Sequence, residues 1–240
     1  MGGMEAAVHL AERVAPVTLA TEQRLAGPEA LSPVLPDGGL QRGWSVGVGG
    51  PGSWSLAAAL VAPVQAAGGW VAVLGAPSFG LAGAAGLGFR LDRVVLVERP
   101  PAGRWSSVVA SLIDAVDVVV VDPTGAVTGR DARRLRARAR ERGAVLVHLD
   151  GGLTWPEPVD VALTVTAARW EGLGCGHGHL RARRVEVAGT GRRLPGPVRR
   201  TEVWLPGPDG RVAPVAARSG SPRVHPDAAP EGDRFLERAG

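Results

Sequence analysis

The chain has 240 residues and a formal net charge of +4, and all 27 of its basic residues are arginine because lysine is absent. The absence of lysine excludes a Schiff-base lysine and a lysine in a phosphate-binding loop. Asparagine and tyrosine are also missing, and the single cysteine excludes an internal disulfide and a zinc site built on several cysteines. No apolar run reaches the roughly 18 residues of a membrane-spanning helix, so we expect a cytoplasmic protein without membrane contact.

Charge is divided unevenly along the chain. Residues 1–128 hold 7 Arg against 10 Asp and Glu, whereas residues 129–240 hold 20 Arg against 13. A basic C-terminal half could meet nucleic acid or an acidic protein surface. Arginine-rich codon usage would equally produce a solvated basic surface without a ligand. Composition leaves both interpretations open.

Strand and helix patterns alternate from residue 44 onward. The run VDVVVVD (116–122) is β-branched throughout, which is typical of a strand buried on both faces. The segment DARRLRARARERG (131–143) predicts a helix that ends at Gly143. Further strands are expected at 44–48, 70–75, 92–100 and 144–150, and further helices at 53–67 and 103–115. This order predicts an α/β fold with a mostly parallel sheet flanked by helices.

The pattern changes after Gly151. Residues 159–172 and 179–189 alternate with period two and predict an antiparallel hairpin, and 201–206 would be a last edge strand. We therefore expect an N-terminal helix (4–14) and linker within 1–34 and a core at 35–205, whose first residues (35–43) form a glycine-rich loop. Residues 206–240 are rich in Pro, Gly and Arg and predict a disordered tail with a candidate docking helix at 233–238.

A glycine-rich turn joins the strand at 44–48 to the next helix, which is where phosphates commonly bind in α/β folds. Its residues are Gly49, Gly50, Pro51, Gly52 and Ser53. An active phosphate-binding loop continues into Gly-Lys-Ser/Thr, and Leu56 and Ala57 stand at the last two of these positions. Trp54 adds a bulky ring beside the turn. The turn therefore keeps the shape of a nucleotide loop and lacks its charge.

Other candidate residues carry weaker signals. Asp122 ends the buried strand, as a Mg²⁺-binding aspartate would, but we favour a role in orienting the following Asp-Pro loop. The segment GCGHGH (174–179) resembles part of a metal site but lacks further ligands, so we expect a glycine-rich hairpin turn and no metal. His148, inside an apolar strand, is expected to be a hydrogen-bonded core histidine, and no cofactor is expected.

Two groups of arginines are candidate contacts for nucleic acid or for an acidic partner. Arg133, Arg136 and Arg140 lie on the helix at 131–143, and Arg181 and Arg183 share one face of the strand at 179–189. An ordinary exposed helix surface would explain the first group equally well.

The order of these segments resembles the RecA recombinase superfamily. The segments that carry the resemblance are LPDGGLQRGWSVGVGGPGS, LGFRLDRVVLVERP, VDVVVVDPTG and AVLVHLDGG. WEGLGCGHGHLRARRVEVAG further resembles the C-terminal hairpin of the truncated RecA-like accessory proteins of the bacterial SOS mutasome, the ImuA-type family. The resemblance covers roughly residues 30–190.

The resemblance implies a RecA-like fold without RecA chemistry. Leu56 stands at the phosphate-binding lysine position, Ala57 at the adjoining threonine and Ala76 at the catalytic glutamate, and only Asp122 matches. The family acts in damage-induced translesion synthesis with a Y-family polymerase-like partner, and RecA-like proteins often self-associate. The alternatives are a divergent ATPase, with Arg42 or a neighbouring subunit supplying the cation, and a single-stranded DNA-binding module using the basic C-terminal half.

Overall fold

The computed structural model of the chain describes residues 24–75, 79–101, 103–123, 127–149, 155–173 and 178–215. The predicted helices at 4–14 and 233–238, the position Ala76 and most of the GCGHGH segment lie outside these residues.

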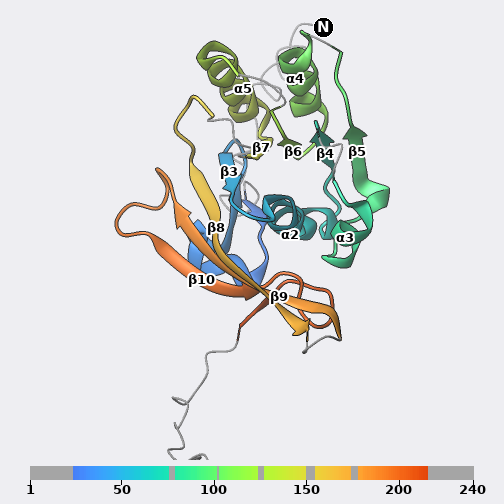
Figure 1. Cartoon of the computed structure of the whole chain (residues 1–240). Helices are drawn as coiled ribbons and strands as arrows, with labels where there is room; N and C mark the ends of the chain where they lie inside the picture. The colour runs from blue at the N-terminus through green and yellow to red at the C-terminus, as the bar shows by residue number, and fades with distance from the viewer. Residues whose placement is uncertain are drawn as a thin grey trace, which may run out of the picture.

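A nine-stranded sheet forms the centre of the protein (Figure 1). Its strands are β3 (Ser45–Gly49), β4 (Val71–Leu74), β5 (Val94–Val97), β6 (Val118–Val121), β7 (Val145–Leu149), β8 (Val161–Leu173), β9 (Gly178–Thr190), β10 (Arg199–Trp204) and β11 (Ala213–Pro214). Their spatial order is β11-β10-β9-β8-β3-β7-β6-β4-β5. The strands from β8 to β5 pair in parallel, and β9, β10 and β11 add antiparallel pairs.

Helices cover both faces of the parallel part of the sheet. Helices α2 (Ser53–Ala66) and α3 (Leu81–Gly86) lie on one face, and α4 (Trp105–Ala115) and α5 (Gly129–Arg142) lie on the other (Figure 1). Alternate residues of β6 enter two separate cores, Val118 and Val120 on the α2 side and Val119 and Val121 on the α5 side. This two-sided burial explains the continuous β-branched run, and it confirms the predicted α/β class.

Local signals set the limits of α5. The Thr128 side chain accepts a hydrogen bond from the Asp131 N–H, and Gly143 ends the helix with a φ of 69°. The buried residues Ala132, Leu135 and Ala139 form the narrow apolar stripe that faces the sheet. The helix therefore begins two residues before the predicted start and ends where the sequence predicts.

The N-terminal boundary of the core lies earlier than predicted. Strands β1 (Arg24–Ala26) and β2 (Gly39–Gln41) form a small antiparallel sheet, and short helices η1 (Glu29–Val34) and η2 (Pro36–Gly38) join them. Leu31 and Val34 of η1 are fully buried, and Val34 packs against the backbone of Gly189 in β9. Residues 24–34 thus belong to the core because their apolar side chains cover the antiparallel end of the sheet.

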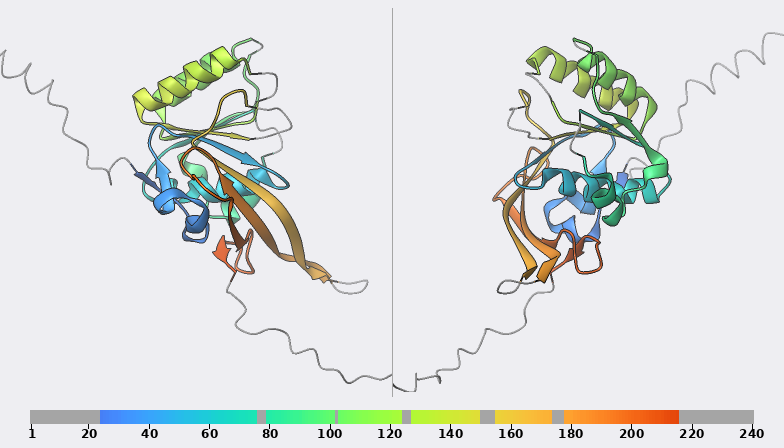
Figure 2. Two further views of the ribbon diagram at one scale, coloured as in Figure 1. Left: turned by 90° about the vertical axis from the view of Figure 1, so that its left-hand side faces the viewer. Right: turned by 45° about the vertical axis from the view of Figure 1, so that its right-hand side comes forward.

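The predicted C-terminal hairpin is present as β8 and β9, which extend beyond the helical layers (Figure 2). The expected last edge strand, β10, is followed by β11, which pairs with it at Val203 and Trp204. Between them the Gly207 N–H donates to the Arg211 carbonyl at 2.7 Å. Residues 206–215 are therefore folded, so the predicted tail boundary at 206 is too early, and residues 216–240 lie outside the described residues.

Candidate functional site

The glycine-rich turn follows the carboxyl end of β3 and begins α2. Gly50 and Gly52 adopt φ values of 84° and 78°, which L-residues with a side chain rarely adopt. Gly52 is the N-cap of α2 and no side chain caps the helix there. The sequence prediction of a strand, a glycine turn and a helix at residues 44–67 is confirmed in its geometry.

The space beside this turn is occupied by the chain itself. A Cβ atom on Gly50 would lie 2.2 Å from the carbonyl oxygen of Val165 in β8, and one on Gly52 would lie 2.2 Å from Nη1 of Arg183 in β9. The Arg183 guanidinium donates to the Pro51 carbonyl oxygen and lies 5.9 Å from the ring centroid of Trp170. A guanidinium and a strand backbone thus lie against one side of the turn, while Gly50, Pro51 and Gly52 stay exposed on the other.

Arg183 is a buried cation, with 7% of its surface exposed. Within the described part of the chain, no carboxylate lies within salt-bridge distance of it, and burial lowers the pKa of its guanidinium. Its contacts are the Pro51 carbonyl and the face of Trp170. The prediction that Arg183 is an open contact for nucleic acid or a partner is therefore wrong, because the side chain turns inward onto the glycine turn. Arg181, two residues earlier, is exposed.

The two positions that replace the nucleotide-loop lysine and hydroxyl belong to the core. Leu56 is 0% and Ala57 1% exposed, and both pack in the apolar cluster between α2 and the sheet. Ser53 and Trp54 at the helix start are half-buried. The Trp54 ring packs against Phe79 with the ring centroids 5.1 Å apart. Residues 56 and 57 therefore face the hydrophobic interior.

Asp122 lies immediately after β6, as the sequence predicts. Its backbone N–H donates to the Leu74 carbonyl at 2.9 Å, and burial raises the pKa of its carboxyl group. The loop that it was expected to orient begins with Pro123, and residues 124–126 of that loop lie outside the described residues. The proposed loop-orienting role stays a prediction.

Arg42 lies at the end of the parallel strands opposite the glycine turn. Its Nη2 donates to the Asp117 carboxylate at 2.7 Å and its Nη1 to the Gly143 carbonyl at 3.3 Å. These residues precede the parallel strands β3, β6 and β7, whereas the glycine turn follows β3. Five strand residues separate the two positions, which corresponds to roughly 16 Å. Arg42 is thus not beside the turn.

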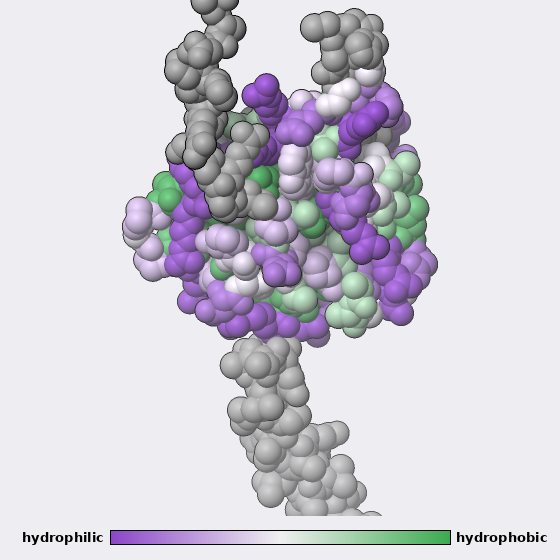
Figure 3. Space-filling view, turned by 90° about the horizontal axis from the view of Figure 1, so that it is seen from below, coloured by the Kyte–Doolittle hydropathy of each residue, from purple (hydrophilic) through white to green (hydrophobic). Residues whose placement is uncertain are grey.

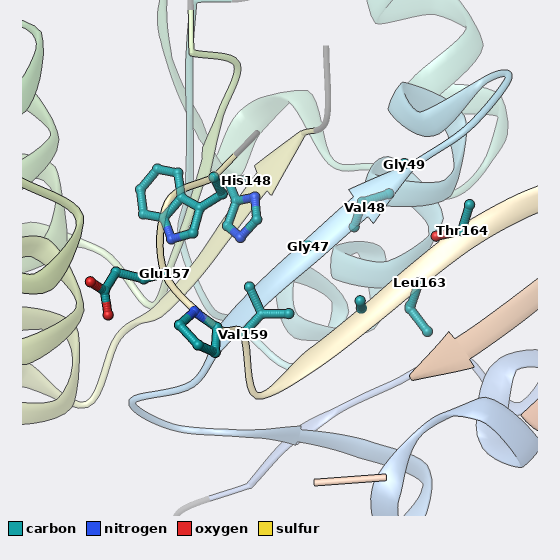
Figure 4. Close-up of a pocket in the computed structure, with 11 residues that line it drawn as sticks. Gly47, Val48, Gly49, His148, Glu157, Val159, Leu163 and Thr164 are labelled. Carbon is teal, nitrogen blue, oxygen red and sulfur yellow. The ribbon is translucent and has the colours of Figure 1, made fainter. Parts of the chain in front are cut away.

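A cavity of about 270 Å³ opens beside β3, on the sheet face opposite α2 (Figure 4). Gly47 forms part of its floor, and a Cβ atom there would lie 3.1 Å from Cε1 of His148. The walls include Ala162, Leu163 and Val159. The absence of a side chain at Gly47 leaves room for the imidazole at the base of the cavity.

His148 and Trp155 stack face to face at this cavity, with ring centroids 4.5 Å and ring planes 9° apart. His148 is 5% exposed, and burial lowers its pKa from 6.5 to about 3, so the imidazole is neutral. His148 is a core residue as predicted. The prediction that it is hydrogen-bonded is wrong for its Nε2 atom. Neither His148 Nε2 nor Trp155 Nε1 has a hydrogen-bond partner among the described residues.

The two predicted arginine groups lie in different places. Arg133 and Arg140 of α5 face the segment before β8, where Arg133 pairs with Glu157 at 3.0 Å and Arg140 lies 3.7 Å from Asp160. Arg136 is on the same side of α5, and its pKa is lowered first by burial and then by Arg140 and Arg192. Two further arginines of α5, Arg138 and Arg142, contact Asp114 of α4.

Asp160 is a functional candidate that sequence reasoning missed. It is 1% exposed, its Oδ2 accepts a hydrogen bond from the Ser45 N–H at 3.0 Å, and its Oδ1 accepts one from Arg192 at 2.8 Å. Arg140 and Arg193 lie 3.7 Å from the same oxygen. The available signal was a carboxylate directly before the apolar strand β8, in a chain region rich in arginine.

No group of three or more His, Cys, Asp or Glu side chains that could hold a metal ion occurs in the described ranges. Of the GCGHGH segment, residues 174–177 lie outside those ranges, and His179 is exposed on β9. None of the helices in the described ranges is long and apolar enough to cross a membrane.

The chain is similar to a protein-family model and to a curated protein. Residues 33–157, which include the glycine turn, α2 to α5 and Trp155, match the family model described as MT3502 N-terminal domain. The chain is also 41% identical over 101 residues, 42% of its length, to the uncharacterized protein Rv3395c of Mycobacterium tuberculosis (strain ATCC 25618 / H37Rv). It spans about half of that curated relative, 49% of its length. Because the family model covers more than half of the 240 residues, the chain belongs to the MT3502 N-terminal domain family.

Proposed function

We propose that this protein is a non-hydrolysing, RecA-like accessory protein of damage-induced translesion DNA synthesis. It acts in the cytoplasm by protein–protein contact with a Y-family polymerase-like partner, and copies of it self-associate. The order of the segments supports the RecA-like part. A strand and glycine turn, a strand ending in Asp122 and a C-terminal hairpin follow one another as in the resemblance of the sequence to the ImuA-type family.

The observation that carries the absence of hydrolysis is the contact of Arg183 and Val165 with the glycine turn. A phosphate would need the N–H groups at the start of α2 to face open space. Here Arg183 and the Val165 carbonyl lie against Gly52 and Gly50, and the Pro51 carbonyl accepts a hydrogen bond from the guanidinium. Binding of a triphosphate would require Arg183 to leave both Pro51 and Trp170. The hydrophobic burial of Leu56 and Ala57 supports the same conclusion.

Isothermal titration calorimetry with Mg²⁺ and ATP tests this part of the proposal. We expect no saturable heat with the full-length protein. Micromolar affinity that depends on Mg²⁺ would contradict the proposal. An Arg183→Ala variant is the matched probe, because it empties the turn while leaving Leu56 and Ala57 unchanged.

A divergent ATPase is the first alternative, and it requires a cation at the turn. Arg183 is the arginine whose guanidinium lies there, while Arg42 is held by Asp117 at the other edge of the sheet. Because Arg183 donates to the turn's own carbonyl, we favour a structural role for it. Steady-state ATP turnover that is lost in Asp122→Asn would favour the enzyme instead.

Exposed apolar residues support a contact function. Trp170 in β8 and Leu180 in β9 are 44% and 49% exposed, and the hairpin formed by these two strands extends from the body (Figure 2). On the face seen from below, hydrophobic and hydrophilic residues are interspersed (Figure 3). An aromatic and an aliphatic side chain on a projecting hairpin are typical of a protein contact.

The same hairpin favours the second alternative, a single-stranded DNA-binding module, because exposed Arg181 lies on the same strand as Leu180 and near exposed Trp170. Such binding would weaken steeply with salt. If fluorescence anisotropy with a dT oligonucleotide shows no binding at low salt, this alternative fails.

A pull-down with the polymerase-like protein tests the partner. The comparison is between the full chain and a chain that ends at residue 215, which keeps β11. We expect retention of the partner by the full chain. Retention by neither form, with both forms folded, would contradict the proposal.

A further inference from the structure

Five arginines gather beside the wall of the His148–Trp155 cavity, and we call them the arginine rim. Segment 157–160 forms this wall, with Glu157 and Val159 lining the cavity. Arg133 binds Glu157, and Arg192 Nε donates to the Val159 carbonyl at 3.4 Å. Two segments supply the five arginines of the rim. Helix α5 supplies Arg133, Arg136 and Arg140, and the turn after β9 supplies Arg192 and Arg193.

The rim faces solvent with an excess of positive charge. Five guanidinium groups share two carboxylates, so the cluster has a net charge of +3. Both carboxylates are less exposed than the arginines that they contact. Glu157 is largely buried and Asp160 is fully buried, whereas the Arg133 side chain is 70% exposed. Arg136 has a buried Nε without a partner among the described residues. Burial, and then repulsion from Arg140 and Arg192, lowers the pKa of Arg136, so an added anion near this group would stabilise the cluster.

The cavity beside the rim has two nitrogens that lack partners. His148 Nε2 and Trp155 Nε1 are buried and make no hydrogen bond to any residue in the described ranges. A buried polar group without a partner is destabilising, so a ligand that hydrogen-bonds to it gains affinity. Val159, Ala162 and Leu163 contribute aliphatic lining beside the polar Glu157 and Thr164, and the volume of about 270 Å³ accommodates a large apolar side chain.

We propose that the arginine rim and the cavity together bind an acidic peptide segment of a protein partner, with one large apolar side chain of that segment inserted between His148 and Ala162. The peptide backbone supplies a carbonyl to the Trp155 Nε1–H, and its flanking carboxylates pair with the rim. This inference rests on the proposed function, because it specifies the chemistry of the protein contact.

The cavity favours a peptide over a nucleic acid. Single-stranded nucleic acids are bound by aromatic faces that are free to stack with bases. Here one Trp155 face is covered by the His148 ring, and the residue also packs against the α4–α5 core. Apart from Glu157, which pairs with Arg133, the other wall residues in the described ranges have no charge and no aromatic ring. An apolar anchor with flanking acidic residues matches both the shape and the charge.

Fluorescence anisotropy of the full-length protein with two synthetic probes tests the proposal. Both probes are short glutamate-rich peptides, one with a central phenylalanine and one with a central alanine. We expect the phenylalanine probe to bind about tenfold more tightly, as burial of its ring predicts. Ala162→Leu fills the cavity and should remove this difference. Arg133→Gln with Arg192→Gln should weaken both probes about tenfold.

Arg24→Gln is the matched control, because Arg24 pairs with exposed Asp37 in the small β1–β2 sheet and should leave both affinities unchanged. Equal binding of the two probes, or tighter binding of a dT oligonucleotide that displaces them, would overturn the inference. If the probes fail while the polymerase-like protein is still retained by Ala162→Leu, the docking site is wrong and the proposed function stands. Circular dichroism and thermal melts establish that each variant is folded.

Discussion

Arg183 in β9 donates a hydrogen bond to the carbonyl of Pro51, a residue 132 positions earlier in the chain. The contact joins the antiparallel hairpin to the glycine turn, and it buries a cation without a carboxylate partner in the described residues. The aromatic face of Trp170 lies 5.9 Å from the guanidinium carbon. The hairpin and the turn are thus structurally coupled.

Replacement of Arg183 with alanine should lower the free energy of unfolding by about 1–3 kcal/mol. The variant loses the hydrogen bond to Pro51, the contact with Trp170 and the packing against Gly52. Urea denaturation measures the effect. Arg181→Ala is the control, since that exposed side chain should contribute within about 0.5 kcal/mol. Equal effects of the two substitutions would argue against a structural role for Arg183.

Reintroduction of a nucleotide-loop lysine should not create nucleotide binding. Leu56→Lys places an ammonium group at a position with no exposed surface, so we expect a loss of several kcal/mol at neutral pH. Leu56→Met, which nearly conserves volume, should cost less than about 1.5 kcal/mol. Thermal melts compare the variants, and calorimetry with ATP follows. A stable Leu56→Lys protein that binds ATP would show that residue 56 can reach the turn.

Asp160→Asn should destabilise the protein by about 2–4 kcal/mol. The carboxylate is buried and contacts Arg192, Arg140 and Arg193, so the substitution leaves these guanidinium groups without its charge. Asp37→Asn removes a carboxylate from an exposed pair with Arg24 and should change stability by less than about 1 kcal/mol. Chemical denaturation of both variants checks the difference, and similar values would mean that the rim is stabilised independently of Asp160.

His148 should make stability depend on pH in the acidic range. Its pKa is about 3 in the folded protein and 6.5 for an ordinary histidine, so the unfolded chain binds the proton first as pH falls. Above about pH 6.5 His148 is neutral in both states and does not affect stability. Between roughly pH 6 and pH 3 the free energy of unfolding decreases by about 1.4 kcal/mol for each unit by which the pH falls. Denaturation at several pH values measures this slope. His148→Phe, which keeps a ring against Trp155, should have a shallower slope, and an unchanged slope would assign the effect to other groups.

The chain order of the core elements could be predicted from local patterns. The valine run of β6 predicts a strand buried on both faces, and the stripe of Ala132, Leu135 and Ala139 predicts the orientation of α5. The glycine turn before α2 was predicted from the run of glycines between a strand pattern and a helix pattern, and Gly50 and Gly52 adopt positive φ values there. Residues 24–34 were misassigned because their burial depends on contacts with β9, far along the chain.

The sequence by itself determined the α/β class, the glycine turn and the loss of the lysine and hydroxyl positions at Leu56 and Ala57. Only the tertiary structure decided that Arg183 fills the turn while Arg181 faces solvent, and that Asp160 gathers arginines from α5 and the turn after β9. Alternation along a strand shows which residues share a face. Which element that face meets depends on the register of β8 against β3 and β9, where Thr164 pairs with Gly49 and Trp170 with Arg183. The pairing of Thr164 with Gly49 joins residues more than a hundred positions apart, so no local pattern specifies it.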